Sequence, residues 1–347
     1  MIGALRGSVL LALGATTFLL CAAGIRALLP WPAEGSLDAR WRHFRAHRDD
    51  YDLVFVGSST VARGVDPGAF DRALAQHGRA LHSYNLAADN MQSTEAGYLL
   101  RQVVAHRTPR LRYAVIELLE FAPRGMLRRN AFTDRAVYWH DLPGLLDAWR
   151  RVAASRDGRR EKLELVWLHL RHAAWRASNF GRAERAIEAW HDGADPADLA
   201  VAAAGGFEAL DDRPDPASLR MREQFLASLP GYVAQLDEIE LRNRVPSLAP
   251  ADLARSMREQ TAWLRAAGIE PIYVIPPVSW PTPELIAIAR EPGIGAVVSL
   301  ASPARFPELF DPAHRWDGTH VNRAGAALAS ERLAAEVGPR LEGAGRP

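Results

Sequence analysis

Short apolar segments that alternate with helical segments constrain the fold of this chain more than any other feature. Residues 52–57, Asp-Leu-Val-Phe-Val-Gly, form a short apolar run that ends in glycine, which is typical of a buried strand leading into a tight turn. The predicted strands are residues 52–57, 82–86, 113–119, 271–275 and 296–300, and the predicted helices are residues 67–76, 92–104, 250–267 and 322–337. Strands that alternate with helices in this way predict a parallel sheet covered on both faces, an α/β sandwich.

A long segment without any strand pattern separates the third predicted strand from the fourth. Residues 124–249 are rich in Arg, His and Trp, and we expect them to form a large, mostly helical insertion, a candidate cap over the carboxyl edge of the sheet. Its tryptophans are more typical of a hydrophobic core than of a platform on which sugars stack, and both interpretations stay open. They are Trp139, Trp149, Trp167, Trp175 and Trp190.

The N-terminus carries an apolar run of a different length. Nineteen residues without a charge, residues 7–25, lie between Arg6 and Arg26. At about 1.5 Å per residue, a helix of this length just spans the hydrocarbon core of a bilayer. We therefore expect residues 1–29 to form an uncleaved membrane anchor. A cleaved signal peptide is the alternative, because Ala22, Ala23 and Gly24 place small residues near the end of the run.

The segment after the anchor contains prolines, a glycine and charges of both signs. We expect residues 30–50 to form a stalk and residues 51–347 to form the functional domain. The basic residues on the two sides of the run specify its orientation only weakly. The expectation that the domain lies outside the cytoplasm on a single-pass anchor rests on the run being N-terminal and solitary.

Composition excludes several classes of function. The 42 basic and 41 acidic residues give a formal net charge of +1, so the chain has no overall field that would attract nucleic acid. The single cysteine, Cys21, cannot form an internal disulfide. His169 and His172 are spaced like two zinc ligands on one helix, but no third ligand is evident, and we expect no metal site.

The first candidate catalytic motif is Gly57-Ser58-Ser59, which lies directly after the first predicted strand. Ligands of open α/β sheets bind beyond the carboxyl ends of the strands, and a serine at such a turn can sit at a helix N-terminus, where free N–H groups stabilise negative charge. Taken alone, the pattern is more typical of an ordinary turn, because Ser and Gly are common turn residues.

A second motif, Trp316-Asp317-Gly318-Thr319-His320, precedes the last predicted helix. A carboxylate three residues before an imidazole, with a glycine that permits a turn, can orient the ring by accepting its N–H. A solvated surface loop is the alternative. We expect Asn322 to cap the helix rather than to take part in the chemistry.

Together the two motifs resemble those of the SGNH/GDSL hydrolase superfamily, which has an early Gly-x-Ser after the first strand and Asp-x-x-His before the final helix. The resemblance covers residues 52–86 and 271–337. It implies a three-layer α/β/α sandwich with a flavodoxin-like parallel sheet. It also implies that Ser59 is the nucleophile, with His320 as base and Asp317 as its acidic partner, and that no cofactor is needed.

The chain departs from the family pattern at three places. Ser58 replaces the aspartate of Gly-Asp-Ser, residues 84–90 lack the usual glycine of the second block, and residues 117–123 lack the third block, Gly-x-Asn-Asp. The N–H of Ser59 remains a candidate oxyanion donor, whereas the side-chain donor is unassigned. Asn85 and Asn90 are candidates, and a structural role for each is the alternative.

Acyl transfer is the mechanism that fits these residues. Water as acceptor gives an esterase, and a sugar hydroxyl gives an O-acyltransferase. The anchor and Ser58 resemble exported SGNH-like proteins that modify cell-surface polymers, which implies an acylated carbohydrate or small ester as substrate and a membrane-bound acyl-exporting enzyme as partner. The alternative is a catalytically degenerate SGNH domain that binds polysaccharide as an assembly scaffold.

Overall fold

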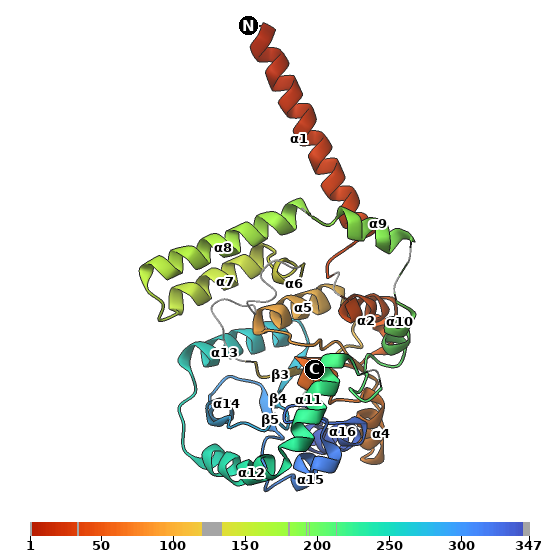
Figure 1. Ribbon diagram of the computed structural model, residues 1–347, viewed down its shortest axis with the longest axis vertical. Coiled ribbons are helices and arrows are strands. Elements are labelled where there is room, and N and C mark those ends of the chain that lie inside the picture. The colour runs from red at the N-terminus through yellow and green to blue at the C-terminus, as the bar shows by residue number, and fades with distance from the viewer. Residues whose placement is uncertain are drawn as a thin grey trace. The chain divides into compact units, whose positions relative to one another are not determined.

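A computed structural model describes residues 2–32, 35–119, 134–179, 181–191, 193, 195–212 and 214–342 (Figure 1). The chain forms two units. The first consists of residues 1–39 and 122–198, and the second of residues 40–121 and 199–347.

The second unit is built on a parallel sheet. Among the described residues, five strands pair in the order β2-β1-β3-β4-β5, all parallel. This is the order of flavodoxin-like doubly wound sheets, and it confirms the predicted fold class. The strands are β1 (Leu53–Val56), β2 (Ser83–Asn85), β3 (Tyr113–Glu117), β4 (Glu270–Ile275) and β5 (Ala296–Ser299).

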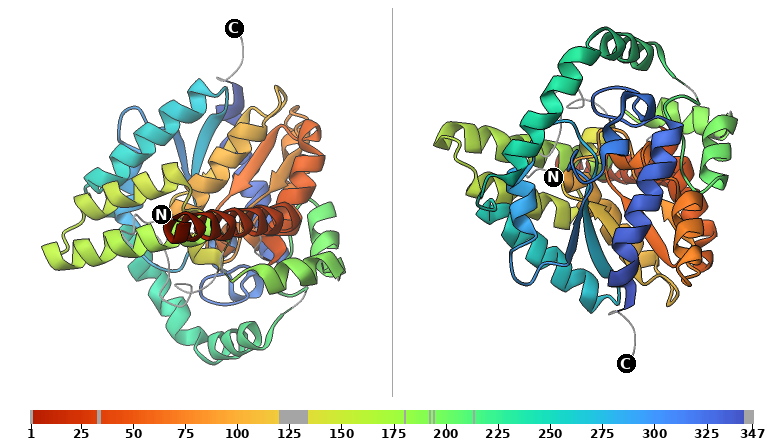
Figure 2. Two further views of the ribbon diagram at one scale, coloured as in Figure 1. Left: turned by 90° about the horizontal axis from the view of Figure 1, so that it is seen from above. Right: turned by 90° about the horizontal axis from the view of Figure 1, so that it is seen from below.

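Both faces of the sheet are covered, which explains why its strands are continuous apolar runs. Leu53 and Phe55 of β1 lie in one core cluster with Leu74 and Leu333, which belong to α4 and α16. Because successive side chains of a strand point to opposite faces, Val54 and Val56 face the other layer, where α5 packs on β1 and α13 on β4. Figure 2 shows these two helical layers from opposite sides. These helices are α4 (Pro67–Gln76), α5 (Ser93–His106), α13 (Ala251–Ala266) and α16 (Arg323–Val337).

Capping groups define the ends of these helices. Asp66 accepts a hydrogen bond from Gly68 N at the start of α4, and Asn322 accepts one from Gly325 N at the start of α16, which confirms its predicted role. Gly268, with a φ of 76°, ends α13 in the left-handed region that favours glycine. The remaining helices of this unit are α3 (Ser59–Ala62), α11 (Pro216–Ala227), α12 (Leu229–Arg244), α14 (Pro283–Ile288) and α15 (Pro307–Phe310).

The described part of the first unit is helical. It contains α1 (Ile2–Leu28), α6 (Asp134–Val137), α7 (Leu142–Ala154), α8 (Arg159–Ser178) and α9 (Ala183–His191). Residues 7–28 of α1 are long and apolar enough to cross a membrane. Trp139 is fully buried, whereas the side chain of Trp167 is largely exposed, so the tryptophans of the predicted insertion do not share one role.

Two predicted boundaries differ from the division into units. The predicted insertion, residues 124–249, is divided: its first part belongs to the first unit, and residues 199–249 belong to the second, where the Tyr232 hydroxyl donates to Phe310 O of α15. The predicted stalk also crosses a boundary. Helix α2 (Gly35–Ala46) ends within the second unit, where Trp41 packs edge-on against His106 and is buried.

Candidate active site

The strand order reverses beside β1, because β2 follows on one side of it and β3, β4 and β5 on the other. The carboxyl ends of the strands at such a switch point bound the crevice in which doubly wound folds bind ligands. Gly57 follows β1 directly, and Glu117 is the last residue of β3. The Gly57-Ser58-Ser59 turn therefore lies at the position where this architecture places its sites.

The turn after β1 is closely packed. A Cβ atom on Gly57 would lie 2.6 Å from Glu117 Oε2 and 2.8 Å from Val61 Cγ2, so this position requires glycine. Ser58 has extended backbone and precedes α3, whose first residue is Ser59. The N–H of Ser59 has no hydrogen-bond acceptor in the part of the chain that the structure describes. Ser59 thus combines a side-chain hydroxyl with a free backbone donor.

Glu117 holds this turn from the neighbouring strand. Its Oε2 accepts the N–H of Ser58, and its Oε1 accepts the hydroxyls of Ser58 at 3.0 Å and Thr60 at 2.7 Å. Burial raises the pKa of Glu117 above its ordinary value of 4.5, although the hydrogen bonds from Thr60 and Ser58 act in the opposite direction. Sequence reasoning missed this residue; a carboxylate at the end of a buried strand, parallel to the strand of the serine turn, was the available signal.

The loop before α16 supplies the other two predicted residues. His320 Nδ1 lies 3.0 Å from Asp317 Oδ2, and Asp317 Oδ1 accepts the backbone N–H groups of Thr319 at 2.6 Å and His320 at 2.7 Å. Burial opposes ionisation of Asp317, but the hydrogen bonds from His320 and Thr319, with the charge of His320, outweigh it and lower the pKa of Asp317 below 3.8. Asp317 is therefore an ionised acceptor that orients the imidazole.

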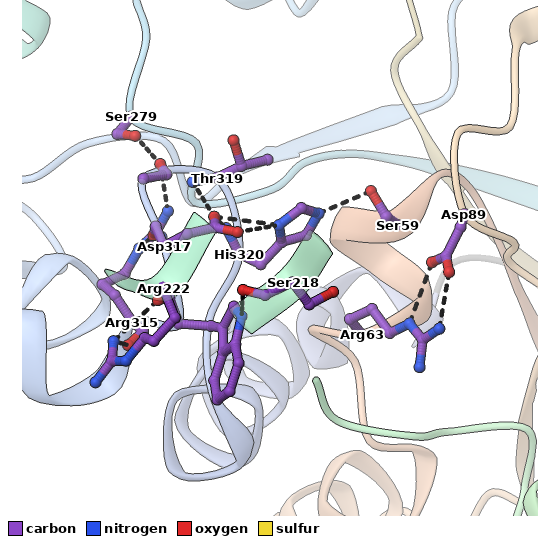
Figure 3. Close-up of polar contacts among 12 residues, drawn as sticks. Ser59, Arg63, Asp89, Ser218, Arg222, Ser279, Arg315, Asp317, Thr319 and His320 are labelled. Atoms are coloured by element: carbon purple, nitrogen blue, oxygen red, sulfur yellow. Dashed lines mark hydrogen bonds and ion pairs between the residues drawn. The ribbon is translucent and has the colours of Figure 1, made fainter. Parts of the chain in front are cut away.

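Ser59 and His320 meet although 261 positions separate them in the sequence. Ser59 Oγ lies 2.8 Å from His320 Nε2 (Figure 3). Since the Asp317 carboxylate can only accept, His320 Nδ1 carries the proton and Nε2 accepts the hydrogen of the serine hydroxyl. The three predicted catalytic residues thus form one hydrogen-bonded chain, in the geometry that activates a serine nucleophile.

Arg315 fixes the shape of the Asp317 loop from within the protein. Its side chain is fully buried and donates to the carbonyl groups of Pro277 at 2.6 Å, Gly318 at 2.8 Å and Asp317 at 3.3 Å. Burial lowers the pKa of Arg315, and the nearby Asp317 charge acts in the opposite direction. Ser279, in the loop after β4, also donates to Gly318 O. The loop that carries the imidazole is therefore tied to the loop after β4 through both Pro277 and Ser279.

One of the two candidate oxyanion donors has a structural role instead. Asn85 is fully buried, and its Nδ2 donates to Val61 O at 3.0 Å and Val65 O at 2.9 Å, while its Oδ1 accepts Ala87 N. Both amide hydrogens are therefore used to fix the backbone after α3. Asn85 is not available to an oxyanion, which corrects that prediction.

The second candidate, Asn90, lies at a tight turn. Its φ of 55° places it in the left-handed region, where asparagine is tolerated, and its side chain is exposed. No contact joins Asn90 to Ser59 or His320 among the described residues, and its role as a donor stays a prediction. The neighbouring Asp89 instead forms a bidentate pair with Arg63, at 2.7 and 3.1 Å.

Arg63 connects that side of the site to the segment after α10 (Pro196–Ala203). Its Nη1 lies 2.7 Å from Glu208 Oε2. Burial acts to lower the pKa of Arg63, but the hydrogen bonds and charges of Asp89 and Glu208 outweigh it and raise this pKa. Arg63 is a fully paired cation, so it closes this side of the site rather than offering a free charge to a ligand.

A groove of about 540 Å³ lies against the Asp317 loop, and its described lining includes Asp317, Gly318 and Thr319 but neither Ser59 nor His320. Helices α11 and α12 form one wall, and the loop after β4 contributes to the lining. Asp317 is the one charged residue among its described lining residues. The uncharged polar and aromatic lining residues are Gln224, Phe225, Ser228, Tyr232, Gln235, Ser279 and Thr319.

Comparisons with family models, with curated proteins and with solved structures found no match for this chain.

Proposed function

We propose that this protein is a membrane-anchored serine esterase or O-acyltransferase of the SGNH type. The single observation that carries the proposal is the hydrogen-bonded chain from Ser59 through His320 to Asp317, with 2.8 Å between Ser59 Oγ and His320 Nε2. This chain lies at the switch point of a parallel sheet, next to a groove. A buried structural network would not need a hydroxyl, an imidazole and an ionised carboxylate in this order.

The proposed reaction proceeds through an acyl-enzyme. Ser59 Oγ attacks the ester carbonyl carbon while His320 Nε2 takes the hydroxyl proton, and the new C–O bond leaves the carbonyl oxygen as an oxyanion. The N–H of Ser59 donates to that oxyanion; one such donor typically stabilises the transition state by about 2.7 to 4 kcal/mol. His320 then gives the proton to the leaving alcohol. Water or a sugar hydroxyl takes the acyl group from Ser59 by the reverse sequence.

The groove supports an acylated carbohydrate as the substrate. Its lining offers the amides of Gln224 and Gln235 and the hydroxyls of Ser228 and Ser279, together with the ring of Phe225. Amides and hydroxyls that donate and accept match sugar hydroxyls, and an aromatic ring matches the apolar face of a sugar. The described lining has no cation to pair with an anionic substrate.

The N-terminal helix supports a position at the membrane. We propose that α1 anchors the protein, that its catalytic unit lies outside the cytoplasm, and that a membrane-bound acyl-exporting enzyme supplies acyl groups when the acceptor is a sugar. In this arrangement the substrate is a cell-surface or exported polymer.

A direct test is covalent labelling of the full chain by a fluorophosphonate probe, together with release of p-nitrophenol from p-nitrophenyl acetate. We expect labelling of the wild type, none of Ser59→Ala, and residual labelling of Ser58→Ala, because Ser58 Oγ hydrogen-bonds to Glu117 and not to His320. Labelling that depends on Ser58 alone would contradict the assignment of the nucleophile.

One observation favours the scaffold as a second candidate function. Both amide hydrogens of Asn85 are used within the protein, so the oxyanion has no identified side-chain donor. A degenerate domain would bind polysaccharide but neither react with the probe nor hydrolyse the ester. Retained binding of an acetylated oligosaccharide without any labelling of Ser59 would favour the scaffold.

A further inference from the structure

The outer face of α8 is apolar and exposed. Leu163, Trp167 and Leu170 have 71%, 66% and 40% of their surface exposed. Their spacing of four and then three residues places them on one side of the helix, and the exposed Ala174 and Ala177 extend the same stripe. We call these five residues the α8 stripe. A helix that only faces water normally carries polar residues at such positions.

The α8 stripe is separate from the face of α8 that packs into the protein. The opposite side of the same helix carries Leu165, His169 and His172, which are buried, and α7 packs against α8. The helix therefore already has an inner face, and the α8 stripe is a second apolar face. An exposed set of large apolar side chains marks a contact with another apolar surface.

The position of α8 along α1 identifies that surface. Asn179, which caps α8, donates to Ala22 O at 2.9 Å, and Arg26 lies against the C-terminal end of α8, 3.4 Å from Arg176 O. Ala22 and Arg26 belong to the last two turns of the apolar stretch, residues 7–28. If α1 spans a bilayer, these turns lie at the level where the hydrocarbon meets the headgroups.

Two further contacts fix this junction. Ile25 of α1 and Leu29, the residue after α1, pack with Ala186 of α9, and the guanidinium of Arg182 stacks on the ring of Trp31 at 3.5 Å. In Figure 1, α1 rises from the junction on the side of α8 opposite α7. Because α7 covers the inner face, the α8 stripe faces the side on which the bilayer would lie.

The charges of α8 also match a membrane surface. Its sequence carries five basic residues, Arg159, Arg160, Lys162, Arg171 and Arg176, and two acidic ones, Glu161 and Glu164, a net charge of +3. Helices that lie in the interface combine Trp and Leu on one face with basic residues beside it, and they insert the apolar face by about 5 to 10 Å. Basic residues near an anionic surface add electrostatic attraction to the burial of the apolar face.

We propose that the α8 stripe lies in the headgroup region of the same bilayer that α1 spans, as a second membrane contact of the first unit. The proposal rests on the anchoring part of the proposed function and is independent of the catalytic part. A transmembrane helix alone leaves the unit free to tilt and rotate, whereas a helix bound flat on the surface fixes its orientation. The occupant is lipid, not a partner protein.

Spin labels in proteoliposomes test this directly. The full chain contains one cysteine, so Cys21→Ser leaves a background in which a single introduced cysteine carries the label. We would label Leu163→Cys, Trp167→Cys and Leu170→Cys in vesicles of phosphatidylethanolamine and phosphatidylglycerol, with no other protein present. All three labels should be several-fold less accessible to a water-soluble nickel chelate, and more accessible to oxygen, than the control labels.

The chain offers matched controls. Glu164→Cys lies on the same helix beside the α8 stripe, and Leu241→Cys on α12 replaces a leucine with 68% exposure in the other unit. Both labels should stay accessible to nickel. Leu13→Cys reports on the anchor itself, because Leu13 lies within the apolar stretch of α1.

The outcomes are distinct. Protected labels at Leu13 and on the α8 stripe, with accessible controls, support the proposal. A protected Leu13 label with nickel-accessible stripe labels overturns it while leaving the anchor in place, and the α8 stripe would then be open to a protein partner. An accessible Leu13 label overturns both the anchor and this proposal.

Discussion

At the scale of single residues, two carboxylates of the site have opposite environments. The pKa of Asp317 is lowered, because hydrogen bonds from His320 and Thr319 outweigh burial, whereas burial raises the pKa of Glu117. The two groups therefore serve different purposes. Asp317 is the ionised partner of the His320 imidazole, and Glu117 is a buried acceptor that fixes the serine turn.

Asp317→Asn should separate the fold from the chemistry. Asparagine keeps one oxygen for the N–H groups of Thr319 and His320 but places an amide donor where Oδ2 now faces His320 Nδ1. The ring should then adopt the wrong tautomer, with a loss in acylation rate on the order of 10⁴-fold. Single-turnover acylation by p-nitrophenyl acetate measures the loss, and a circular dichroism melt serves as the folding control. Wild-type rates in this variant would show that the loop is not catalytic.

The same substitution should change the pH dependence of stability. The folded-state pKa of Asp317 is depressed below 3.8, so its contribution to the free energy of unfolding is present above that pH and is lost as the pH falls through the lower folded value. The difference between the wild type and Asp317→Asn, measured by urea unfolding in detergent, should therefore shrink as the pH falls below 3.8. A difference that grows toward acid would contradict the assignment of an ionised Asp317.

Glu117→Gln and Glu117→Ala form a matched pair. Glutamine can accept the N–H of Ser58 and donate to the hydroxyls of Ser58 and Thr60, which also act as acceptors, so acylation should change little. Alanine leaves the partly buried N–H of Ser58 unpaired, at a cost of about 1 to 3 kcal/mol, and frees the turn. Acylation rates and urea unfolding of both variants check this. Equal rates in the two would show that Glu117 does not position Ser59.

The contribution of Glu117 to the free energy of unfolding should change with pH in the opposite direction to that of Asp317. Because the folded pKa is raised above 4.5, the stability contributed by the protonated group is complete below 4.5 and is lost as the pH rises through the folded value. The unfolding free energy of the wild type relative to Glu117→Gln should fall as the pH rises over that range.

At the scale of elements, the turn between β1 and α3 depends on a glycine. Gly57→Ala would place a Cβ atom 2.8 Å from Glu117 Cβ and 2.8 Å from Val61 Cγ2, so the turn must shift and move Ser59 relative to His320. We expect a lower melting temperature and a large loss of probe labelling. Gly97→Ala is the control, because its new Cβ would meet only Arg101 Nη1 at 3.9 Å, and it should stabilise α5 by about 0.5 to 1 kcal/mol. Equal behaviour of the two variants would contradict the role given to Gly57.

The elements that the sequence predicted well are those with a strong local signal. Helix α4 lies at the predicted residues 67–76, and α16 begins one residue after Asn322, because Asp66 and Asn322 are N-caps. The five strands differ from prediction by one or two residues at their ends, since apolar runs continue past the last ladder hydrogen bond.

The features that the sequence could not predict are contacts between distant segments. Glu117 meets Ser58 across 59 positions, and nothing in the spacing of either segment encodes that pairing. The role of Asn85 depends likewise on the position of the carbonyl groups of Val61 and Val65 in the folded chain. Periodicity shows which face of an element is buried, but it does not show which polar groups meet at the edge of a sheet.

At the scale of the whole molecule, the chain joins a helix that is apolar and long enough to cross a membrane to the candidate active site. Residues 7–28 form the one helix in the described part of the chain that is apolar and long enough to cross a bilayer. A single span places everything after it on one side. The first unit contains this helix, and the second contains all three predicted catalytic residues, so under the proposed function the helix sets the side of the membrane on which the reaction occurs.

Fusions after Pro347 should show that this side is outside the cytoplasm. Alkaline phosphatase needs an oxidising compartment to form its disulfides, so its fusion should be active, whereas a β-galactosidase fusion at the same position should be inactive. The physical reason is that the charge-free run, residues 7–25, acts as the export signal, although the flanking arginines bias its orientation only weakly. Deleting residues 7–25 is the matched control and should reverse both activities. An active β-galactosidase fusion on the intact chain would place the catalytic unit in the cytoplasm, and an exported polymer would then no longer be accessible to Ser59.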